Sequence, residues 1–160
     1  EWLAVRALLK ELCGEEKSVS YYPSGKPYLT DGSARISFSH TQGYVAVAVH
    51  PCKEVAVDIE QYGTRVKRVA HKFIRGDEGT SISSADEIYA LLLHWSAKET
   101  MFKLMEEEAV DFLDHLRIFP FTLQESGVME AQEFRSSNEQ KFLIHYDTHP
   151  DYVLTFACLD

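Results

Sequence analysis

The sequence predicts an α+β fold, and three observations carry this prediction. Apolar residues recur at helical spacing near the start of the chain and again between residues 85 and 105. Elsewhere, strand-like segments are separated by turn-forming residues, as in antiparallel hairpins. The 160 residues contain no linker rich in proline or serine, so the elements should pack around one continuous core or two closely paired cores. Helices that are segregated from hairpin-linked strands are typical of α+β proteins.

The first predicted element is a helix from Trp2 to Leu12, in which apolar residues lie three and four apart. Gly14 should end this helix, because glycine is common just after a helix C-terminus. Residues 34–38 and 44–49 then predict a hairpin, since turn-forming residues separate them. A further strand is predicted over residues 54–60.

Two more helices follow, over residues 65–73 and 85–105. Ser84 is predicted to cap the longer one, and Glu87, three positions on, completes a capping box. Beyond Arg117 the pattern changes to strands that suit an antiparallel meander. The four predicted strands are 119–124, 128–135, 141–147 and 152–159.

The composition excludes several classes of function. Lys and Arg number 16 against 25 Asp and Glu, so the formal net charge is −9 and would repel a nucleic-acid backbone. The longest apolar run, Tyr44–Val49, is far shorter than the roughly 20 residues of a membrane-spanning helix. The first 30 residues hold no apolar signal-peptide core. We therefore expect a soluble cytoplasmic protein that binds neither nucleic acid nor a membrane.

Two carboxylates share one face of the strand predicted at residues 54–60. Side chains alternate along a strand, so Asp58 and Glu60 point to the face opposite Val57 and Ile59. Like charges at neighbouring positions are unfavourable unless water, a basic partner or a cation relieves them. An exposed strand face is the simpler interpretation, and a shared cation is the alternative.

The long predicted helix supplies a third carboxylate, Glu99. Spacings of four, three, four and three residues place it in one stripe with Ile88, Leu92, Trp95 and Phe102. One interpretation is an ion pair with Lys103 one turn later, which would stabilise the helix by a few tenths of a kcal/mol. The other is that Glu99 joins Asp58 and Glu60 around a hard cation, because magnesium takes carboxylate oxygens together with water and substrate phosphate.

Two upstream loops contain residues suited to phosphate contacts. Ser24-Gly25-Lys26-Pro27 places a lysine in a turn, where Gly25 lets the backbone approach a ligand closely and Pro27 fixes the exit of the chain. Ser39-His40-Thr41 is expected at the bend of the hairpin. Each signal is weak alone, since a Gly-Lys-Pro turn is usually only a turn and a single His more often packs or lies on the surface.

Taken in order, these segments resemble the 4′-phosphopantetheinyl transferases, specifically the monomeric type that activates carrier proteins of peptide and fatty-acid synthesis. The resemblance spans Gly25 to Lys103. It rests on four motifs: Gly25-Lys26-Pro27-Tyr28-Leu29, Ile36-Ser37-Phe38-Ser39-His40-Thr41, Val57-Asp58-Ile59-Glu60 and Trp95-Ser96-Ala97-Lys98-Glu99-Thr100-Met101-Phe102-Lys103. The last two motifs, at this separation, are highly specific.

The resemblance implies a pseudo-twofold arrangement of two related halves, each an antiparallel sheet packed with helices. We expect the first half over residues 1–53, without part of its N-terminal region, and the second over residues 54–160 with most metal ligands. The site would lie between the halves of a monomer.

The resemblance also implies a reaction: magnesium-dependent transfer of 4′-phosphopantetheine from coenzyme A to a serine of an apo acyl or peptidyl carrier protein. Asp58, Glu60 and Glu99 would hold magnesium against the pyrophosphate of coenzyme A. Glu99 would also take the proton of the serine hydroxyl, directly or through a water, with Lys103 as a second catalytic residue. Contacts with coenzyme A would come from Gly25, Lys26, Pro27, Ser39, His40, Lys98 and Lys103.

Carrier proteins of this kind are acidic, and a basic segment follows the strand that contains Asp58. This segment, residues 65–75, contains no acid and has five cations: Arg65, Lys67, Arg68, Lys72 and Arg75. A local basic patch can steer an acidic partner even on an acidic protein. A solvated helix face is the alternative interpretation.

Ser37, Thr41, Ala56 and Thr100 are mild departures from the family pattern, and two further departures are larger. Only 24 residues precede Gly25, where the family usually carries a longer segment with basic residues. Residues 105–108, Met-Glu-Glu-Glu, replace a stretch that is often rich in glycine. Two other functions share part of the pattern: another magnesium-dependent phosphoryl-transfer or phosphodiester-hydrolysing enzyme, and an inactive carrier-binding module.

Overall fold

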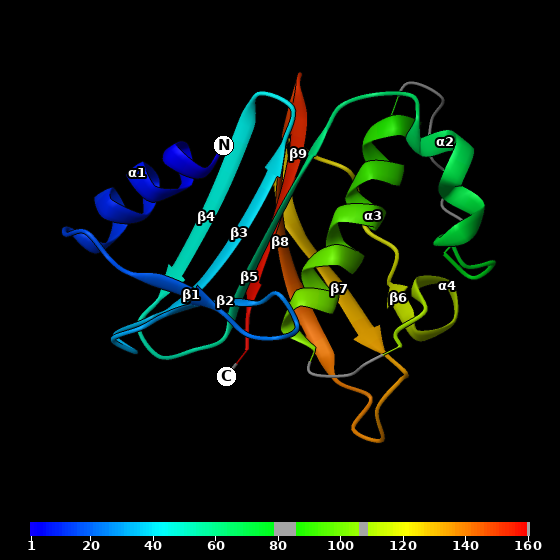
Figure 1. Ribbon diagram of the computed structural model, residues 1–160. Coiled ribbons are helices and arrows are strands. Elements are labelled where there is room, and N and C mark those ends of the chain that lie inside the picture. The colour runs from blue at the N-terminus through cyan, green and yellow to red at the C-terminus, as the bar shows by residue number, and fades with distance from the viewer. Residues whose placement is uncertain (79–85, 106–108, 160) are drawn as a thin grey trace.

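Antiparallel sheets and the helices packed on them make up this computed structural model, which describes residues 1–78, 86–105 and 109–159 (Figure 1). The predicted α+β fold is thus confirmed. No helix in the described part of the chain is both long enough and apolar enough to span a bilayer. In chain order the elements are α1 (Trp2–Cys13), β1 (Val19–Tyr21), β2 (Pro27–Leu29), β3 (Arg35–Thr41), β4 (Tyr44–His50), β5 (Val55–Gln61), α2 (Val66–Val69), the 3-10 helix η1 (Ala70–Lys72), α3 (Glu87–Leu104), α4 (Phe112–His115), β6 (Leu116–Ile118), β7 (Ser126–Glu133), β8 (Lys141–His149) and β9 (Tyr152–Cys158).

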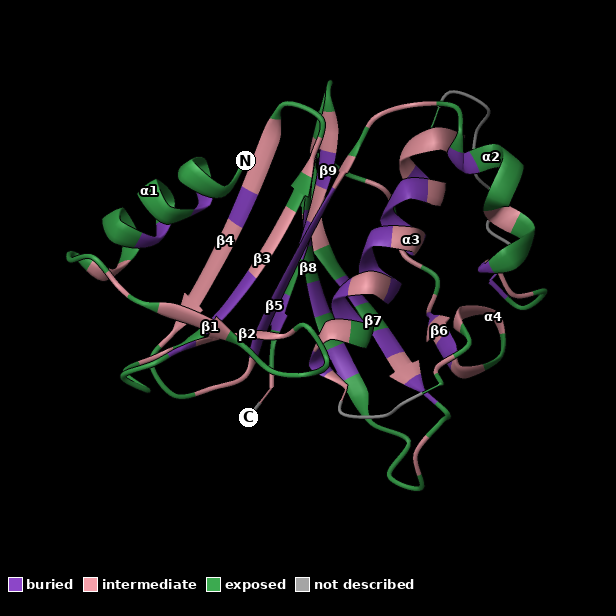
Figure 2. Ribbon diagram, in the orientation of Figure 1, coloured by how far each residue is buried: buried purple, intermediate pink, exposed green. Residues whose placement is uncertain are grey.

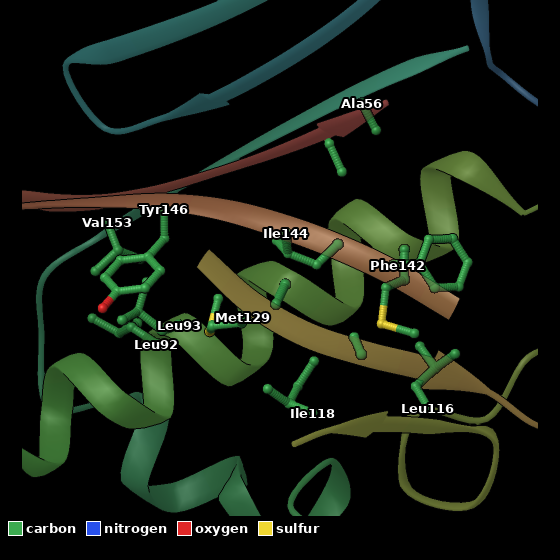
Figure 3. Packing of buried hydrophobic residues seen from close by; sticks show 14 of the residues in the cluster. Ala56, Leu92, Leu93, Leu116, Ile118, Met129, Phe142, Ile144, Tyr146 and Val153 are labelled. Atoms are coloured by element: carbon green, nitrogen blue, oxygen red, sulfur yellow. The ribbon is translucent and has the colours of Figure 1, made fainter. Parts of the chain in front are cut away.

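The largest sheet has five antiparallel strands in the order β5-β9-β8-β7-β6. α3 lies across one face of this sheet, and the principal hydrophobic core fills the space between them (Figure 3). In that core, Leu93 of α3 belongs to the same fully buried cluster as Met129 of β7 and Ile144 of β8. Burial of these side chains therefore holds α3 against the sheet whose edge strand is β5.

The first part of the chain has a small core of its own. Leu9 of α1 is buried in one cluster with Leu29 of β2 and Ile36 of β3. α1 ends at Gly14, whose φ of 73° lies in the left-handed region that glycine adopts without a steric penalty. The predicted first helix and its glycine stop are confirmed.

β3 and β5 run side by side in the same direction, although they belong to separate hydrogen-bonded sheets (Figure 1). Side-chain hydroxyls on β3 act as the acceptors that a neighbouring strand would normally supply. The N–H groups of Val57, Ile59 and Gln61 donate to the hydroxyls of Ser37, Ser39 and Thr41, respectively, at 3.1, 3.2 and 3.2 Å. These bonds fix the register between the first part of the chain and β5.

The hairpin of β3 and β4 is tighter than predicted. β3 continues to Thr41, so only Gln42 and Gly43 lie in the loop. The expectation that Ser39-His40-Thr41 forms the bend was wrong, because the ladder extends to the last of these residues. Since side chains alternate along a strand, Ser39 and His40 point to opposite faces of β3.

Three of the four strands predicted after Arg117 are present as β7, β8 and β9. The fourth was wrong: residues 119–124 form a loop, and the chain pairs with β7 earlier, at β6. Pro120 has no N–H group to give to a ladder. Phe121 and Leu123 pack against the main core from the loop, so their apolar side chains produced a strand-like pattern.

α3 begins at Glu87, and Ser84, its predicted cap, lies outside the described residues. The helix is buried on most of its circumference (Figure 2). The predicted apolar stripe is not its most buried side, because Phe102 is 42% exposed. Within this stripe Trp95 donates to Glu60 of β5, while Trp95 and Phe102 both lie against Phe112 of α4.

Candidate active site

The carboxylate of Asp58 lies where three elements meet. Asp58 points from β5 toward α3 and is only 4% exposed, so the interpretation as an exposed strand face is wrong for this residue. Its Oδ1 accepts hydrogen bonds from Ser39 Oγ of β3 at 3.0 Å and from Lys103 Nζ of α3 at 2.8 Å. Its Oδ2 accepts one from Ser96 Oγ of α3 at 2.9 Å. Together these three donors fix the orientation of the carboxylate.

Glu60 and Glu99 lie close enough to Asp58 for its charge to act on both. Burial and the Asp58 charge raise the pKa of Glu60, while a 2.9 Å hydrogen bond from Trp95 Nε1 and the charge of Lys103 oppose this shift. Burial, followed by the charge of Asp58, raises the pKa of Glu99 to about 7, against the opposing charge of Lys103. Glu99 can therefore take up or release a proton at neutral pH.

Lys103 places one ammonium group among these carboxylates. Its Nζ donates to Asp58 Oδ1 and to the backbone oxygen of Val57, both at 2.8 Å. The helical ion pair between Glu99 and Lys103, one of the two interpretations of the sequence, is not formed between these two described residues. Lys103 instead reaches across to β5 and ties α3 to that strand.

The donor set suits a divalent cation. Three carboxylates and one ammonium leave an excess of negative charge, and carboxylate oxygens are the ligands that magnesium prefers. Among residues 1–78, 86–105 and 109–159, no group of three or more His, Cys, Asp or Glu side chains stands ready to hold a metal ion. The carboxylate oxygens of Asp58, Glu60 and Glu99 thus suit magnesium as ligands. In the structure, the positive charge that pairs with Asp58 is the Lys103 ammonium.

The structure does not bring Lys98 to this group. Its side chain is completely buried, and its Nζ donates to Glu78 Oε2 at 2.9 Å. It also donates to the backbone oxygens of Phe73 at 2.5 Å and Phe112 at 3.1 Å. All three ammonium protons therefore have acceptors inside the protein. Lys98 was expected to lie beside the pyrophosphate of coenzyme A. Its ammonium lies in the core instead, because the buried Glu78 carboxylate holds it there.

The predicted Gly25-Lys26-Pro27 turn lies beside the start of β5. Gly25 has a φ of 86°, a conformation that favours glycine, and Pro27 begins β2. Lys26 Nζ lies 2.7 Å from Glu54 Oε2, and Arg35 pairs with the other oxygen of that carboxylate at 3.0 Å. The turn is thus held next to β5 but outside the group around Asp58, and its contact with coenzyme A stays a prediction.

Ser39 and His40, predicted together as phosphate contacts, are separated by the strand that holds them. Ser39 Oγ donates to Asp58 and accepts the N–H of Ile59. The His40 side chain is 62% exposed, and its Nε2 lies 3.5 Å from a carboxylate oxygen of Glu1. Because adjacent strand residues face opposite ways, Ser39 joins the carboxylate group and His40 does not.

The basic segment, residues 65–75, contains α2 and η1. These two short helices correspond to the helix predicted over residues 65–73. Two of the segment's five cations are engaged within the protein. Lys67 pairs with Glu87, and Arg75 pairs with Asp77 at 2.9 Å. The other three are exposed and have no ion-pair partner within the described ranges: Arg65, Arg68 and Lys72.

Sequence reasoning gave no role to two donors that hold the carboxylates. Ser96 donates to Asp58, and Trp95 donates to Glu60. A signal for Ser96 was available, because it precedes Glu99 by three residues and therefore lies on the same side of the helix. For Trp95, helical spacing predicts only a place in the apolar stripe.

A comparison with protein-family models matches residues 54–157 to the 4′-phosphopantetheinyl transferase superfamily. The match covers more than half of the chain and includes Asp58, Glu60, Glu99 and Lys103. The chain belongs to the 4′-phosphopantetheinyl transferase superfamily. No curated protein matches the chain.

Membership of the superfamily confirms the resemblance to the family. The chain is therefore an enzyme that transfers phosphopantetheine. Coenzyme A is the substrate of the family, and carrier proteins are its partners. The matched segment begins just before β5 and ends within β9, so it leaves out the Gly25-Lys26-Pro27 turn and Ser39-His40. The roles of those residues in the transferase stay predictions.

Proposed function

We propose that the chain catalyses magnesium-dependent transfer of 4′-phosphopantetheine from coenzyme A to a serine of an apo acyl or peptidyl carrier protein. The products are the holo carrier and adenosine 3′,5′-bisphosphate. The observation that carries this proposal is the group of Asp58, Glu60, Glu99 and Lys103 where β5 meets α3. The group combines an excess of carboxylates with a glutamate that can exchange a proton near pH 7.

In the proposed reaction, the serine oxygen forms a bond to the phosphorus that carries the pantetheine arm. The bond from this phosphorus to the bridging oxygen of the pyrophosphate breaks, and the bridging oxygen leaves with the electron pair. Glu99 takes the serine proton, directly or through a water, because a neutral hydroxyl is a poor nucleophile. In the metal-free protein its pKa of about 7 lets this carboxylate exchange a proton at neutral pH, and a general base needs a pKa near the ambient pH.

The other residues of the group bind and orient. Asp58, Glu60 and Glu99 would hold the magnesium ion. When bound, magnesium neutralises charge on the pyrophosphate. Ser39 and Ser96 keep the Asp58 carboxylate fixed through their hydroxyl donors. We assign to Lys103 the stabilisation of charge on the departing oxygen, because its ammonium is already held at this point between β5 and α3.

We further propose that residues 1–53 and 54–160 act as two halves with the site between them. The bonds of Ser39 to Asp58 and of Lys26 to Glu54 support this division, because both cross the proposed boundary beside β5. In this arrangement contacts with coenzyme A from the first half come from Gly25, Lys26, Pro27, Ser39 and His40. Lys98 is left out of this set because its ammonium is fully engaged in the core.

The carrier protein is proposed to dock on three exposed cations: Arg65, immediately before α2, Arg68 of α2 and Lys72 of η1. Carriers are acidic, so opposite charge would raise the rate of association. Lys67 and Arg75 belong to the same segment, but each already has an acidic partner within the chain.

Incubation of the purified chain with magnesium, coenzyme A and an apo acyl carrier protein tests the proposed function. We expect the mass of the carrier to rise by one phosphopantetheinyl group. Glu99→Ala should lower the rate by at least about 100-fold, because it removes both the proton acceptor and a cation ligand. Circular dichroism should show that this variant is folded.

Glu16→Gln is the matched control, since it removes an exposed carboxylate whose partner is Arg6, and it should react like the wild type. Full activity of Glu99→Ala would contradict the assigned mechanism. Hydrolysis of coenzyme A without a change in carrier mass would instead indicate a phosphodiester-hydrolysing enzyme. Carrier binding with no reaction at all would indicate an inactive module.

A further inference from the structure

A row of buried hydroxyl groups leads from the Asp58 carboxylate into the core. Ser96 Oγ donates to Asp58 Oδ2 at 2.9 Å, and it lies 2.8 Å from Thr155 Oγ1. Thr155 Oγ1 lies 2.7 Å from Thr100 Oγ1. Ser96, Thr100 and Thr155 are all 0% exposed. Thr155 of β9 is also the residue directly opposite Asp58 in the pairing of β5 with β9.

The chemistry of these groups sets the direction of the hydrogen bonds. A carboxylate only accepts, so Ser96 must donate its single hydroxyl proton to Asp58. Ser96 therefore accepts from Thr155, and Thr155 accepts from Thr100. Thr100 also has a longer contact of 3.5 Å with the backbone oxygen of Thr155, but its 2.7 Å bond to Thr155 Oγ1 needs its proton, so the row runs toward Asp58. Hydrogen bonds in such a head-to-tail row polarise one another, so each bond strengthens the next.

Packing alone does not call for hydroxyl groups at these positions. Val153 and Ala157, the neighbours of Thr155 on the same face of β9, are apolar and buried. Valine has nearly the shape of threonine, and replacing a set of mutually bonded polar groups by apolar groups of the same shape is often nearly neutral for stability. What the polar row supplies, and an apolar set could not, is a fixed donor for Asp58.

We propose that Thr155 and Thr100 are positioning residues that act through Ser96 to orient the Asp58 carboxylate for cation binding. This inference rests on the proposed function, in which Asp58 is a ligand of magnesium. Without the Thr155 hydroxyl, Ser96 can turn its proton toward the carbonyl oxygen one turn earlier in α3, as helical serines do. Asp58 then loses one of its three side-chain donors.

The test compares Thr155→Val, which removes the hydroxyl and keeps the shape, with Thr155→Ser, which keeps the hydroxyl. Binding of Mn²⁺ to the metal-free protein is followed by electron paramagnetic resonance, and the Mg²⁺ concentration for half-maximal transfer is measured in parallel. We expect Thr155→Val to weaken Mn²⁺ binding by about 10-fold or more, within the range found for partners of metal ligands. Thr155→Ser should stay within about 2-fold of the wild type, since the donor is kept.

Ser37→Ala is the matched control. Ser37 is buried and its hydroxyl also contacts β5, but it accepts the N–H of Val57 and does not touch Asp58. It should lower the midpoint of thermal unfolding while leaving Mn²⁺ affinity as in the wild type. The proposal is overturned if Thr155→Val binds Mn²⁺ like the wild type, if Thr155→Ser binds as weakly as Thr155→Val, or if Ser37→Ala weakens binding equally.

Asp58→Asn separates the failure of this inference from the failure of the proposed function. If this variant binds Mn²⁺ as tightly as the wild type, Asp58 is not a ligand and the proposed cation site fails, together with the inference that rests on it. If Asp58→Asn loses Mn²⁺ and Thr155→Val does not, the hydroxyl row alone is overturned.

A readout without metal completes the test. In proton NMR spectra of the metal-free protein, we expect the Ser96 hydroxyl proton to exchange slowly with water, because it is buried and hydrogen-bonded. Thr155→Val should make this exchange faster. An unchanged rate in that variant would overturn the proposal.

Discussion

Single residues of the site take their properties from neighbours that are distant in sequence. Glu99 is an ordinary glutamate by its chemistry, and its pKa is raised to about 7 because it is buried beside Asp58. Asp58 is itself buried and receives donors from both β3 and α3. At the scale of the residue, the site is therefore set by burial and by charges that the fold brings together.

The raised pKa of Glu99 predicts how stability changes with pH in the metal-free protein. The folded state holds the Glu99 proton up to about pH 7, whereas the unfolded state releases it near pH 4.5. The stabilisation from this proton is therefore complete below about pH 4.5 and is lost as the pH rises through 7. The side chain of Glu99→Gln has no such proton to release. Between pH 4.5 and 8 the free energy of unfolding of this variant should therefore rise, relative to that of the wild type, by about 1–2 kcal/mol after allowance for solvent screening.

Urea unfolding in the presence of a chelator, repeated at several pH values, measures this difference. Glu16→Gln, which removes an exposed carboxylate, serves as the control and should follow the wild type throughout. A difference between Glu99→Gln and the wild type that does not change with pH would contradict the assigned pKa.

At the scale of the element, α3 carries two lysines with different tasks. Lys98 is fully buried and braces the helix against the chain around Phe73 and Phe112. Lys103 is 28% exposed at its side chain and reaches β5. Helical spacing alone did not separate the two, because α3 is buried on most of its circumference and so has no single polar face.

We expect Lys98→Met and Lys103→Met to differ in what they damage. Lys98→Met leaves the Glu78 carboxylate buried without its ammonium partner, so it should lower the free energy of unfolding by about 3–5 kcal/mol. Lys103→Met should cost less stability, because this side chain is partly exposed, but it should slow transfer by about 100-fold. Urea unfolding and the carrier mass assay check the two effects. Equal losses of stability would contradict the separation of roles.

At the scale of the whole molecule, a net charge of −9 conceals a local basic surface. Arg65, immediately before α2, Arg68 of α2 and Lys72 of η1 are exposed, and burial of Val66 and Phe73 holds this segment in place. Charge placement rather than net charge therefore governs which partners the surface can attract.

Reversal of two of these charges tests the docking surface. The double variant Arg68→Glu and Lys72→Glu should slow carrier modification by about 10-fold at low salt, because the steering attraction becomes repulsion. The dependence of the rate on salt should also weaken. Glu16→Lys, a charge reversal on α1's side of the molecule, is the control and should leave the rate unchanged. Unchanged kinetics of the double variant at low salt would reject this surface.

Local signals in the sequence predicted most of the fold. The glycine that ends α1, the hairpin, β5 and the last three strands follow from turn chemistry and apolar spacing, and all are present. The strand predicted over residues 119–124 was wrong because Phe121 and Leu123 reach the core from a loop. Alternation of apolar residues does not distinguish such a loop from a strand. The bend at Ser39-His40-Thr41 was wrong because the register of the β3–β4 ladder, and not local composition, sets where the loop lies.

By itself, the sequence determined the α+β class, the order of the main elements, the transferase family and the carboxylates to consider, because these depend on periodicity, turn residues and motif spacing. Only the tertiary structure decided which of those residues meet. The hydroxyl bonds between β3 and β5 bring Ser39 to Asp58, and the packing of α3 on the sheet brings Ser96 and Lys103 to it. The same packing draws Lys98 into the core, and strand alternation turns His40 away. Such contacts join residues that are far apart in the chain. Buried polar and charged groups need partners, and the spacing of residues along the chain does not show which partners the fold supplies.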